Sequence, residues 1–283
     1  MGPFKPYNQI YLKGNGVLRG VTLALPTAQV RNLLPYEVEL GEQELTPRGT
    51  HPVILFFYDM YRAHMNIPTL LPNMTYHEQI VGVPFSYVTR GLLNPDHNGP
   101  FFFMPRLNLD NFLATAGGLL WWGFAKQLAH ITVTRNRYSV AERDSGAPLI
   151  SLDFEPTGDY QPLPRLPHLE PVRRMLDQPI LSQLPLGIGP YFVWSDFDKH
   201  WPTARVRPLS TVVTISQEFV QGLPNGRYPA EGRCQGIDQL VLGSYEIRTQ
   251  WRQGLIHPSA FQFGWPLAPQ RAHGRPACYG HSG

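Results

Sequence analysis

Hydrophobic positions along the chain occur in short stretches that often alternate with polar residues, and long helical patterns are rare. Alternation is typical of strands, because successive side chains point to opposite faces of a sheet. The segment His51–Met60 (HPVILFFYDM) is rich in β-branched and aromatic residues, which predicts a buried strand. Further strands are predicted at Gly20–Leu25, Tyr76–Tyr87, Phe101–Pro105, Ile131–Arg137, Leu209–Phe219 and Gln239–Trp251.

Helices are expected to be few and short. Thr27–Leu34 predicts a helix with Thr27 as its N-cap, and a second helix fits Val172–Leu176. Ala125–His130 is ambiguous, because its residues favour a helical turn while the residues that follow alternate. The remaining connections are predicted to be a loop over Ala63–Asn73, a turn over Asn94–Pro100, a hairpin over Ser139–Leu152 that turns at Asp144–Gly146, and a mostly irregular excursion over Pro156–Pro190.

Composition supports the same fold class. The chain has 283 residues, of which 42% are hydrophobic and 16% charged, and its 29 prolines and 26 glycines favour many turns and short strands. We therefore predict a mainly β (α+β) protein, with a large antiparallel sheet or barrel and a few short helices. A single domain is expected over residues 1–255, followed by a Pro/Gly-rich tail over residues 256–283.

Several classes of function and location are disfavoured. The net charge of +3 is too small to indicate a nucleic-acid surface. The histidines show no metal-ligand spacing, and two widely spaced cysteines, Cys234 and Cys278, form no disulfide framework. The N-terminus does not resemble a secretory signal, and the longest apolar run is too short to span a bilayer. We expect a cytoplasmic protein without metal, membrane or nucleic-acid partners.

Lys126 is the first candidate for chemistry. It follows Phe112–Ala125, fourteen uncharged and mostly apolar residues. An ammonium in apolar surroundings loses hydration, which favours the neutral amine, and a neutral lysine amine forms imines with carbonyl compounds. The structural alternative is that Lys126 ends a buried strand and extends its ammonium into water.

Two further residues stand on predicted strands. Glu78 is in an apolar strand and shares a face with Tyr76 and Ile80, where a carboxyl group would serve a partner or a proton transfer. An edge-strand glutamate facing water is the alternative. Tyr245 lies on the more apolar face of the last strand, so its phenol is a candidate substrate donor, with simple core packing as the alternative.

Three segments resemble the acetoacetate decarboxylase-like superfamily, in the family's order. They are LLPYEVELG (Leu33–Gly41), YHEQIVGVPF (Tyr76–Phe85) and the stretch from LDN at Leu109 to GFAKQLAHI, ending at Ile131. The C-terminal IDQLVLGSYEIRTQW resembles the family's final strand more weakly. The resemblance implies a cone-like β-barrel with small flanking helices and the lysine inside, a cofactor-free enzyme, and a homo-oligomer.

The resemblance also implies roles for residues. Lys126 would form a Schiff base with a small oxo acid, and Glu78 would manage protons. The family's second lysine is Gln127 here, a candidate substrate contact, and its arginine in the first strand falls near Gly16, with Arg19 as the nearest substitute. Decarboxylation of a β-oxo acid is the default expectation. The alternatives are condensation and dehydration of pyruvate or a relative with an aldehyde, and a non-catalytic barrel that binds a small molecule.

Overall fold

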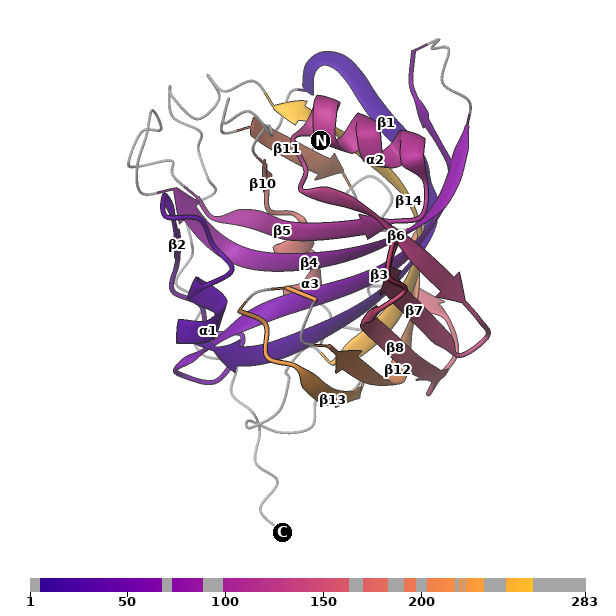
Figure 1. Ribbon diagram of the computed structural model, residues 1–283. Helices are drawn as coiled ribbons and strands as arrows, with labels where there is room; N and C mark the ends of the chain where they lie inside the picture. Colours follow the sequence, from indigo (N-terminus) through magenta and orange to yellow (C-terminus); the bar gives the residue numbers. More distant parts are fainter. Residues whose placement is uncertain are drawn as a thin grey trace.

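A computed structural model describes residues 6–67, 73–88, 99–162, 170–182, 191–196, 203–216, 219–220, 222–231 and 243–256. Strands dominate these residues (Figure 1). The three helices among them are α1 (Thr27–Arg31), α2 (Phe112–Trp122) and α3 (Glu170–Leu176). The strands are β1 (Pro6–Pro26), β2 (Val38–Leu40), β3 (Thr50–Met65), β4 (Met74–Val88), β5 (Phe101–Leu109), β6 (Lys126–Val133), β7 (Arg137–Glu142), β8 (Pro148–Pro156), β9 (Gln161–Pro162), β10 (Ile180–Ser182), β11 (Tyr191–Asp196), β12 (Arg205–Ile215), β13 (Gly226–Glu231) and β14 (Ser244–Ile256).

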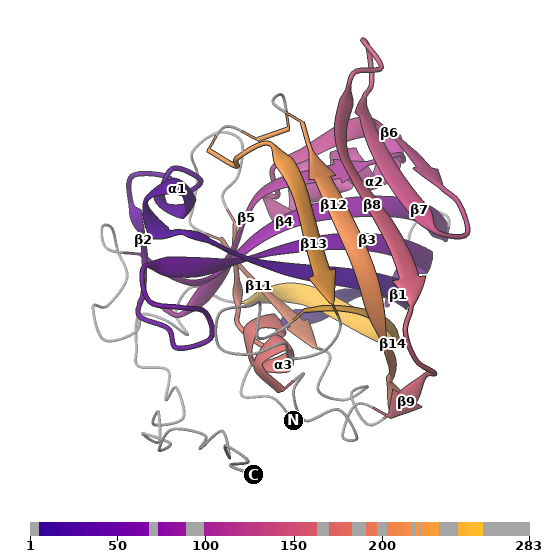
Figure 2. The ribbon, with the colours of Figure 1, turned by 90° about the horizontal axis from the view of Figure 1, so that it is seen from below.

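Nine of these strands close into a barrel. The hydrogen-bonded order is β12, β8, β7, β6, β5, β4, β3, β1 and β14, and β14 pairs again with β12. Figure 2 shows β12, β8 and β7 arching over β3 and β1. Closure pairs the backbone of every strand on both sides and so removes exposed sheet edges. The mainly β barrel expected from the sequence is confirmed, with two parallel pairings, β5–β6 and β5–β10, in an otherwise antiparallel arrangement.

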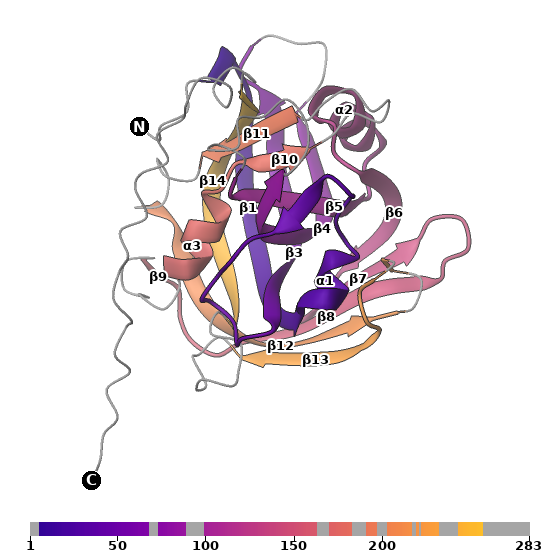
Figure 3. The ribbon, with the colours of Figure 1, turned by 90° about the vertical axis from the view of Figure 1, so that its left-hand side faces the viewer.

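Five strands of the barrel also belong to a second, smaller ring. β10 pairs with β5 and with β11, and β11 pairs with β14, so β5, β4, β3, β1 and β14 form a wall shared by both rings. In Figure 3 this wall lies between β10, β11 and α2 on one side and β8, β12 and β13 on the other. The molecule is therefore divided into two compartments by one curved sheet.

The shared wall carries buried apolar residues on both faces. Leu23, Leu55, Phe57 and Val81 point into the nine-stranded barrel, where they pack with residues of β7, β8 and β12. The alternate positions pack into the smaller compartment with α2 and α3. Each strand of this wall is therefore buried on both faces, which explains the continuous apolar run of His51–Met60.

The charge-free run before Lys126 forms helix α2, so the strand considered for it in the sequence is wrong. Asn111 caps the helix, because its Oδ1 accepts a hydrogen bond of 3.0 Å from the Ala114 amide. Gly123 ends it with a φ of 65°, in the left-handed region that favours glycine. Both cap residues were present as signals in the sequence.

Other local predictions divide into confirmed and corrected ones. The Ser139–Leu152 hairpin and the short helix near Val172 are confirmed. Ala125–His130 is not a helical turn, because β6 begins at Lys126 and its pairing with β5 fixes an extended backbone. The strand predicted over Ile131–Arg137 is interrupted, because β6 ends at Val133 and β7 begins at Arg137.

Several other elements begin or end at residues that differ from the predicted ones. Thr27 is the first residue of α1 and not its cap, which is Pro26, and the helix ends at Arg31. β3 extends to Met65 into the predicted loop, β5 extends to Leu109, and the strand predicted from Leu209 begins at Arg205 and ends at Ile215. Some of the sequence predictions fall on residues outside the described part of the chain. These residues are 68–72, 94–98, 163–169, 183–190, 239–242 and 257–283. None of the described helices has the length and apolar character needed to cross a membrane.

Candidate active site

Lys126 and Glu78 form a buried ion pair. The Nζ of Lys126 lies 3.0 Å from the Oε1 of Glu78, and the two residues are 9% and 4% exposed. The Oε1 of Glu78 has no hydrogen-bond partner among the described residues, and its contact with Lys126 is an ion pair. Lys126 stands opposite Leu107 on β5, and Glu78 on β4 stands opposite Leu109 two positions further along the same strand. The alternation of three adjacent strands thus directs both side chains into one compartment.

Helix α2 packs against the side chain of Lys126 and limits its position. A Cβ atom added at Gly118 would overlap the Cδ and Cε atoms of Lys126, so the helix backbone lies directly against the lysine stem. The neighbouring Gly117 has open space at the same place. The aromatic rings of Phe124 and Tyr76 complete the surroundings, with centroids 5.8 and 6.0 Å from the ammonium. Such distances are within the range of cation–π attraction.

The ion pair faces a cavity of about 210 Å³ in the smaller compartment. Its described wall is predominantly apolar and aromatic. The residues with polar side-chain groups are Tyr58, His64, Tyr76, Glu78, Trp122, Lys126, Trp251 and Gln253, and the others include Leu12, Leu18, Phe56, Met60, Met65, Met74, Phe102, Met104, Leu107, Leu176 and Ile180. A largely apolar cavity with a few convergent polar groups is typical of a small-molecule site.

Two buried tyrosines border the carboxylate. Burial, with a smaller contribution from the charge of Glu78, raises the pKa of Tyr58 and of Tyr76 well above the usual tyrosine value. Both phenols therefore remain hydrogen-bond donors at neutral pH. The hydroxyl of Tyr58 has no hydrogen-bond partner among the described residues, and its ring lies over Gly16 of β1. The sequence analysis did not identify Tyr58 as a site residue, because nothing in the buried strand distinguished it from core.

Arg19, named from the sequence as a substrate contact, lies on the other face of the shared wall. Its guanidinium is 2.9 Å from Asp59 and 2.9 Å from Glu246, and it stacks 4.6 Å from the ring centre of Phe154 inside the nine-stranded barrel. It does not line the described cavity wall. Lys126, in contrast, opens into the smaller compartment, where it lines the cavity.

Gln127 and Tyr245 are not brought to the cavity either. Gln127 is exposed, because it follows Lys126 on β6 and points to the opposite face. Tyr245 is fully buried in the smaller compartment, where its ring lies over Gly20, and burial raises its pKa. Its hydroxyl has no hydrogen-bond partner among the described residues, yet it does not contribute to the described cavity wall.

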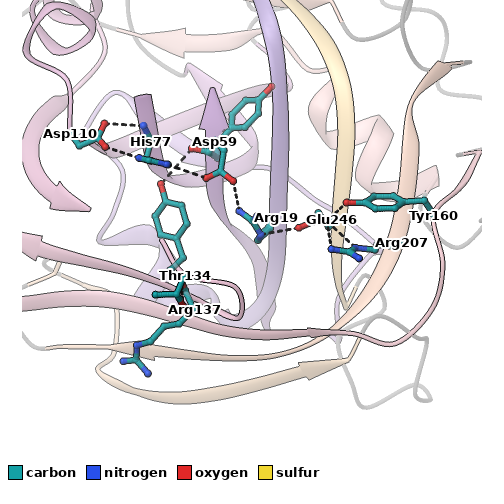
Figure 4. A network of polar contacts seen from close by, with 11 residues as sticks. Arg19, Asp59, His77, Asp110, Thr134, Arg137, Tyr160, Arg207 and Glu246 are labelled. Carbon is teal, nitrogen blue, oxygen red and sulfur yellow. Dashed lines mark hydrogen bonds and ion pairs between the residues drawn. The ribbon is translucent and has the colours of Figure 1, made fainter. Parts of the chain in front are cut away.

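A chain of charged groups crosses the interior of the nine-stranded barrel (Figure 4). Asp110 lies 2.7 Å from His77, the other ring nitrogen of His77 lies 3.9 Å from Asp59, and Asp59 pairs with Arg19. Glu246 continues the chain to Arg207, at 2.6 Å, and to the hydroxyl of Tyr160. The sequence signal for it was Asp59, a single carboxylate within an otherwise apolar strand.

The fold and site together define a closed β-barrel protein with a buried lysine–glutamate pair at an apolar cavity. The family model described as Acetoacetate decarboxylase (ADC) matches residues 11–180, more than half of the chain. The chain belongs to the acetoacetate decarboxylase family, and the segment with Glu78 and Lys126 lies within the match.

Solved structures show the same fold at low sequence identity. Acetoacetate decarboxylase from Legionella pneumophila subsp. pneumophila str. Philadelphia 1 is 12% identical, with a TM-score of 0.54 over 91% of this chain and 90% of that one. An acetoacetate decarboxylase-like enzyme from Sphingomonas wittichii RW1 is 12% identical, with a TM-score of 0.54 over 88% and 93%. The enduracididine biosynthesis enzyme MppR, complexed with pyruvate, is 13% identical, with a TM-score of 0.52 over 89% of each chain. A search of curated proteins found no match.

Proposed function

We propose that this protein is a cofactor-independent lyase in which Lys126 forms a Schiff base with an oxo acid and Glu78 transfers protons. The observation that carries the proposal is the 3.0 Å pair of Lys126 and Glu78, buried at an apolar cavity. A carboxylate at this distance is placed to accept the ammonium proton, which leaves the amine lone pair free to attack a carbonyl carbon.

Decarboxylation of a β-oxo acid is the reaction we propose first. The amine adds to the ketone, and loss of one water gives a protonated imine. The electrons of the bond to the carboxylate then move toward the iminium, so carbon dioxide leaves and an enamine remains. Glu78 returned the ammonium proton in the loss of water, so it takes up a second proton from solvent and delivers it to the enamine carbon. Hydrolysis of the resulting iminium by one water then releases the ketone and restores the Lys126 ammonium. The apolar wall favours the loss of carbon dioxide, because it does not stabilise the carboxylate charge that disappears in that step.

Condensation is the second candidate, and the position of Glu78 favours it specifically. A pyruvate imine becomes a nucleophilic enamine only when a base removes a methyl proton, and Glu78 stands beside the imine nitrogen as such a base. The enamine carbon then forms a bond to an aldehyde carbon, and elimination of water gives the unsaturated product. The fold shared with MppR, solved with pyruvate, motivates pyruvate as the test substrate.

The proposal is tested by trapping the imine. The protein is incubated with acetoacetate or with pyruvate, borohydride is added, and the intact mass is measured. We expect an adduct in the wild type that is absent in Lys126→Ala and retained in Lys13→Ala, a control lysine on β1 outside the described cavity wall. An adduct of the acetone imine, lighter by one carbon dioxide than that of acetoacetate, identifies decarboxylation.

The same experiment separates the candidates. Carbon dioxide release from acetoacetate supports decarboxylation, and an unsaturated product from pyruvate with an aldehyde supports condensation. A wild type that forms no adduct with any oxo acid, or Lys126→Ala with full activity, contradicts both and leaves a barrel that binds a small molecule without reaction.

A further inference from the structure

The cavity extends far beyond the ion pair, along the strands of the shared wall. Glu78 stands opposite Tyr58, which stands opposite Leu18 on β1. At the other end, Leu12 on the same strand stands opposite Met65 and Gln253. Leu18 and Leu12 are six residues apart, which corresponds to about 20 Å of extended strand. Both residues line the cavity, so its wall includes both of these positions of β1.

The cavity is also larger than a small oxo acid requires. A cavity of about 150 Å³ holds benzene, and acetoacetate and pyruvate are molecules of about that size. The cavity here measures about 210 Å³. A small oxo acid bound at Lys126 would therefore leave the distal part of the cavity, around Leu12 and Met65, unfilled.

The distal wall is mainly apolar and adaptable, and its residues with polar side-chain groups are His64, Trp251 and Gln253. Between the ion pair and the far end, the described wall includes Met60, Met65 and Met74. Methionine side chains are flexible and fit apolar groups of different shape. Lys126 and Glu78 are the only Lys, Arg, Asp or Glu residues of the described wall, and they lie together, so no such charged residue of that wall lies at the distal end.

We propose, on the basis of the function proposed above, that the substrate is an oxo acid with an extended apolar chain. The reacting carbonyl binds at Lys126, and the chain lies along β3 and β1 toward Leu12. Each methylene buried in the cavity contributes a transfer free energy of about 0.8 kcal/mol, which corresponds to about a fourfold gain in kcat/KM. The preference for chain length follows from the wall and not from the imine chemistry.

The test is a series of oxo acids measured with the wild type. The series comprises 3-oxobutanoate, 3-oxohexanoate and 3-oxooctanoate, assayed for product and for the borohydride adduct. We expect kcat/KM to rise about fourfold for each added methylene. In Leu12→Trp, which fills the distal end, the ratio of kcat/KM for 3-oxooctanoate to that for 3-oxobutanoate should fall at least tenfold. Lys13→Trp adds the same bulk at the next position, outside the described cavity wall, and should keep the wild-type ratio.

The outcomes separate this inference from the proposed function. Adduct formation with equal kcat/KM for all three acids overturns the extended-chain substrate and leaves the imine chemistry in place. An unchanged ratio in Leu12→Trp also overturns it. The absence of an adduct with every acid in the series contradicts the proposed function itself, and the inference with it.

Discussion

At the scale of single residues, two buried tyrosines with similar surroundings differ in what they face. Tyr58 and Tyr245 each lie over a glycine of β1, and each has a hydroxyl without a partner among the described residues. Tyr58 lines the cavity and Tyr245 does not. We therefore expect a bound oxo acid to accept a hydrogen bond from Tyr58, directly or through a water.

The two Tyr→Phe variants form a matched pair. Tyr58→Phe should lower kcat/KM about fivefold, the effect of losing a hydrogen bond worth about 1 kcal/mol, and Tyr245→Phe should leave it unchanged. Both variants remove an unpaired buried hydroxyl, so both should raise the free energy of unfolding by about 1 kcal/mol. Steady-state kinetics and urea unfolding measure the two effects. Equal kinetics in both variants would assign Tyr58 a packing role only.

The same scale shows why some site residues were predictable and others were not. Lys126 and Glu78 were marked by charge in apolar segments, and the structure brings them together. Arg19 was chosen as the nearest substitute for a residue near Gly16, but three positions along a strand invert the face, so its side chain enters the other compartment. Gln127 fails for the same reason, one position from Lys126. The sequence shows which residues of a strand share a face, but it does not show which compartment each face lines.

At the scale of elements, α2 holds the lysine through a close backbone approach. Ala favours a helix interior over Gly by up to about 1 kcal/mol, so Gly117→Ala and Gly118→Ala should both stabilise the isolated helix. At Gly118 the new methyl group overlaps the lysine stem and must displace it. A displacement of about 1 Å costs roughly a hundredfold in rate.

We therefore expect Gly118→Ala to form the borohydride adduct about a hundredfold more slowly, while Gly117→Ala keeps the wild-type rate. Intact mass measured at successive times gives both rates, and circular dichroism checks that both variants fold. If Gly118→Ala is trapped as fast as the wild type, α2 does not fix the lysine position.

The elements themselves were predictable to different degrees. Alternation located most strands of the barrel, and Asn111 and Gly123 carried cap signals that delimit α2. The second ring was not predictable, because β10 has three residues within the proline-rich excursion, and its pairings with β5 and β11 depend on contacts distant in sequence. Ile180 of β10 lines the cavity, so this part of the cavity wall could not be inferred either.

At the scale of the whole molecule, the shared wall separates the cavity from the chain of charged groups in the nine-stranded barrel. The cavity contains the Lys126–Glu78 pair, and the interior of the nine-stranded barrel contains the chain from Asp110 to Tyr160. Arg19 joins strands β1, β3 and β14 through its pairs with Asp59 and Glu246. These three strands belong to both rings, so the polar chain ties together the wall that supports the cavity.

His77 makes this chain sensitive to pH. The hydrogen bond from its ring to Asp110 raises the pKa of His77, with burial opposing and the charges of Asp110 and Asp59 adding to the increase. A histidine whose folded pKa exceeds the unfolded value of about 6.5 binds its proton more tightly in the folded state. Its contribution to stability is complete below about pH 6.5 and is lost as the pH rises through the folded pKa.

We expect His77→Gln to reduce the free energy of unfolding more at pH 5.5 than at pH 8.5, as measured by urea unfolding at both values. His130→Gln, at an exposed position of β6, provides the control and should show the same small change at both. Because His77 faces the compartment opposite the cavity, His77→Gln should still form the borohydride adduct with Lys126 at neutral pH. A variant that lost the adduct while remaining folded would show that the two compartments are coupled through the shared wall. An equal loss of stability at both pH values would show that folding does not raise the pKa of His77.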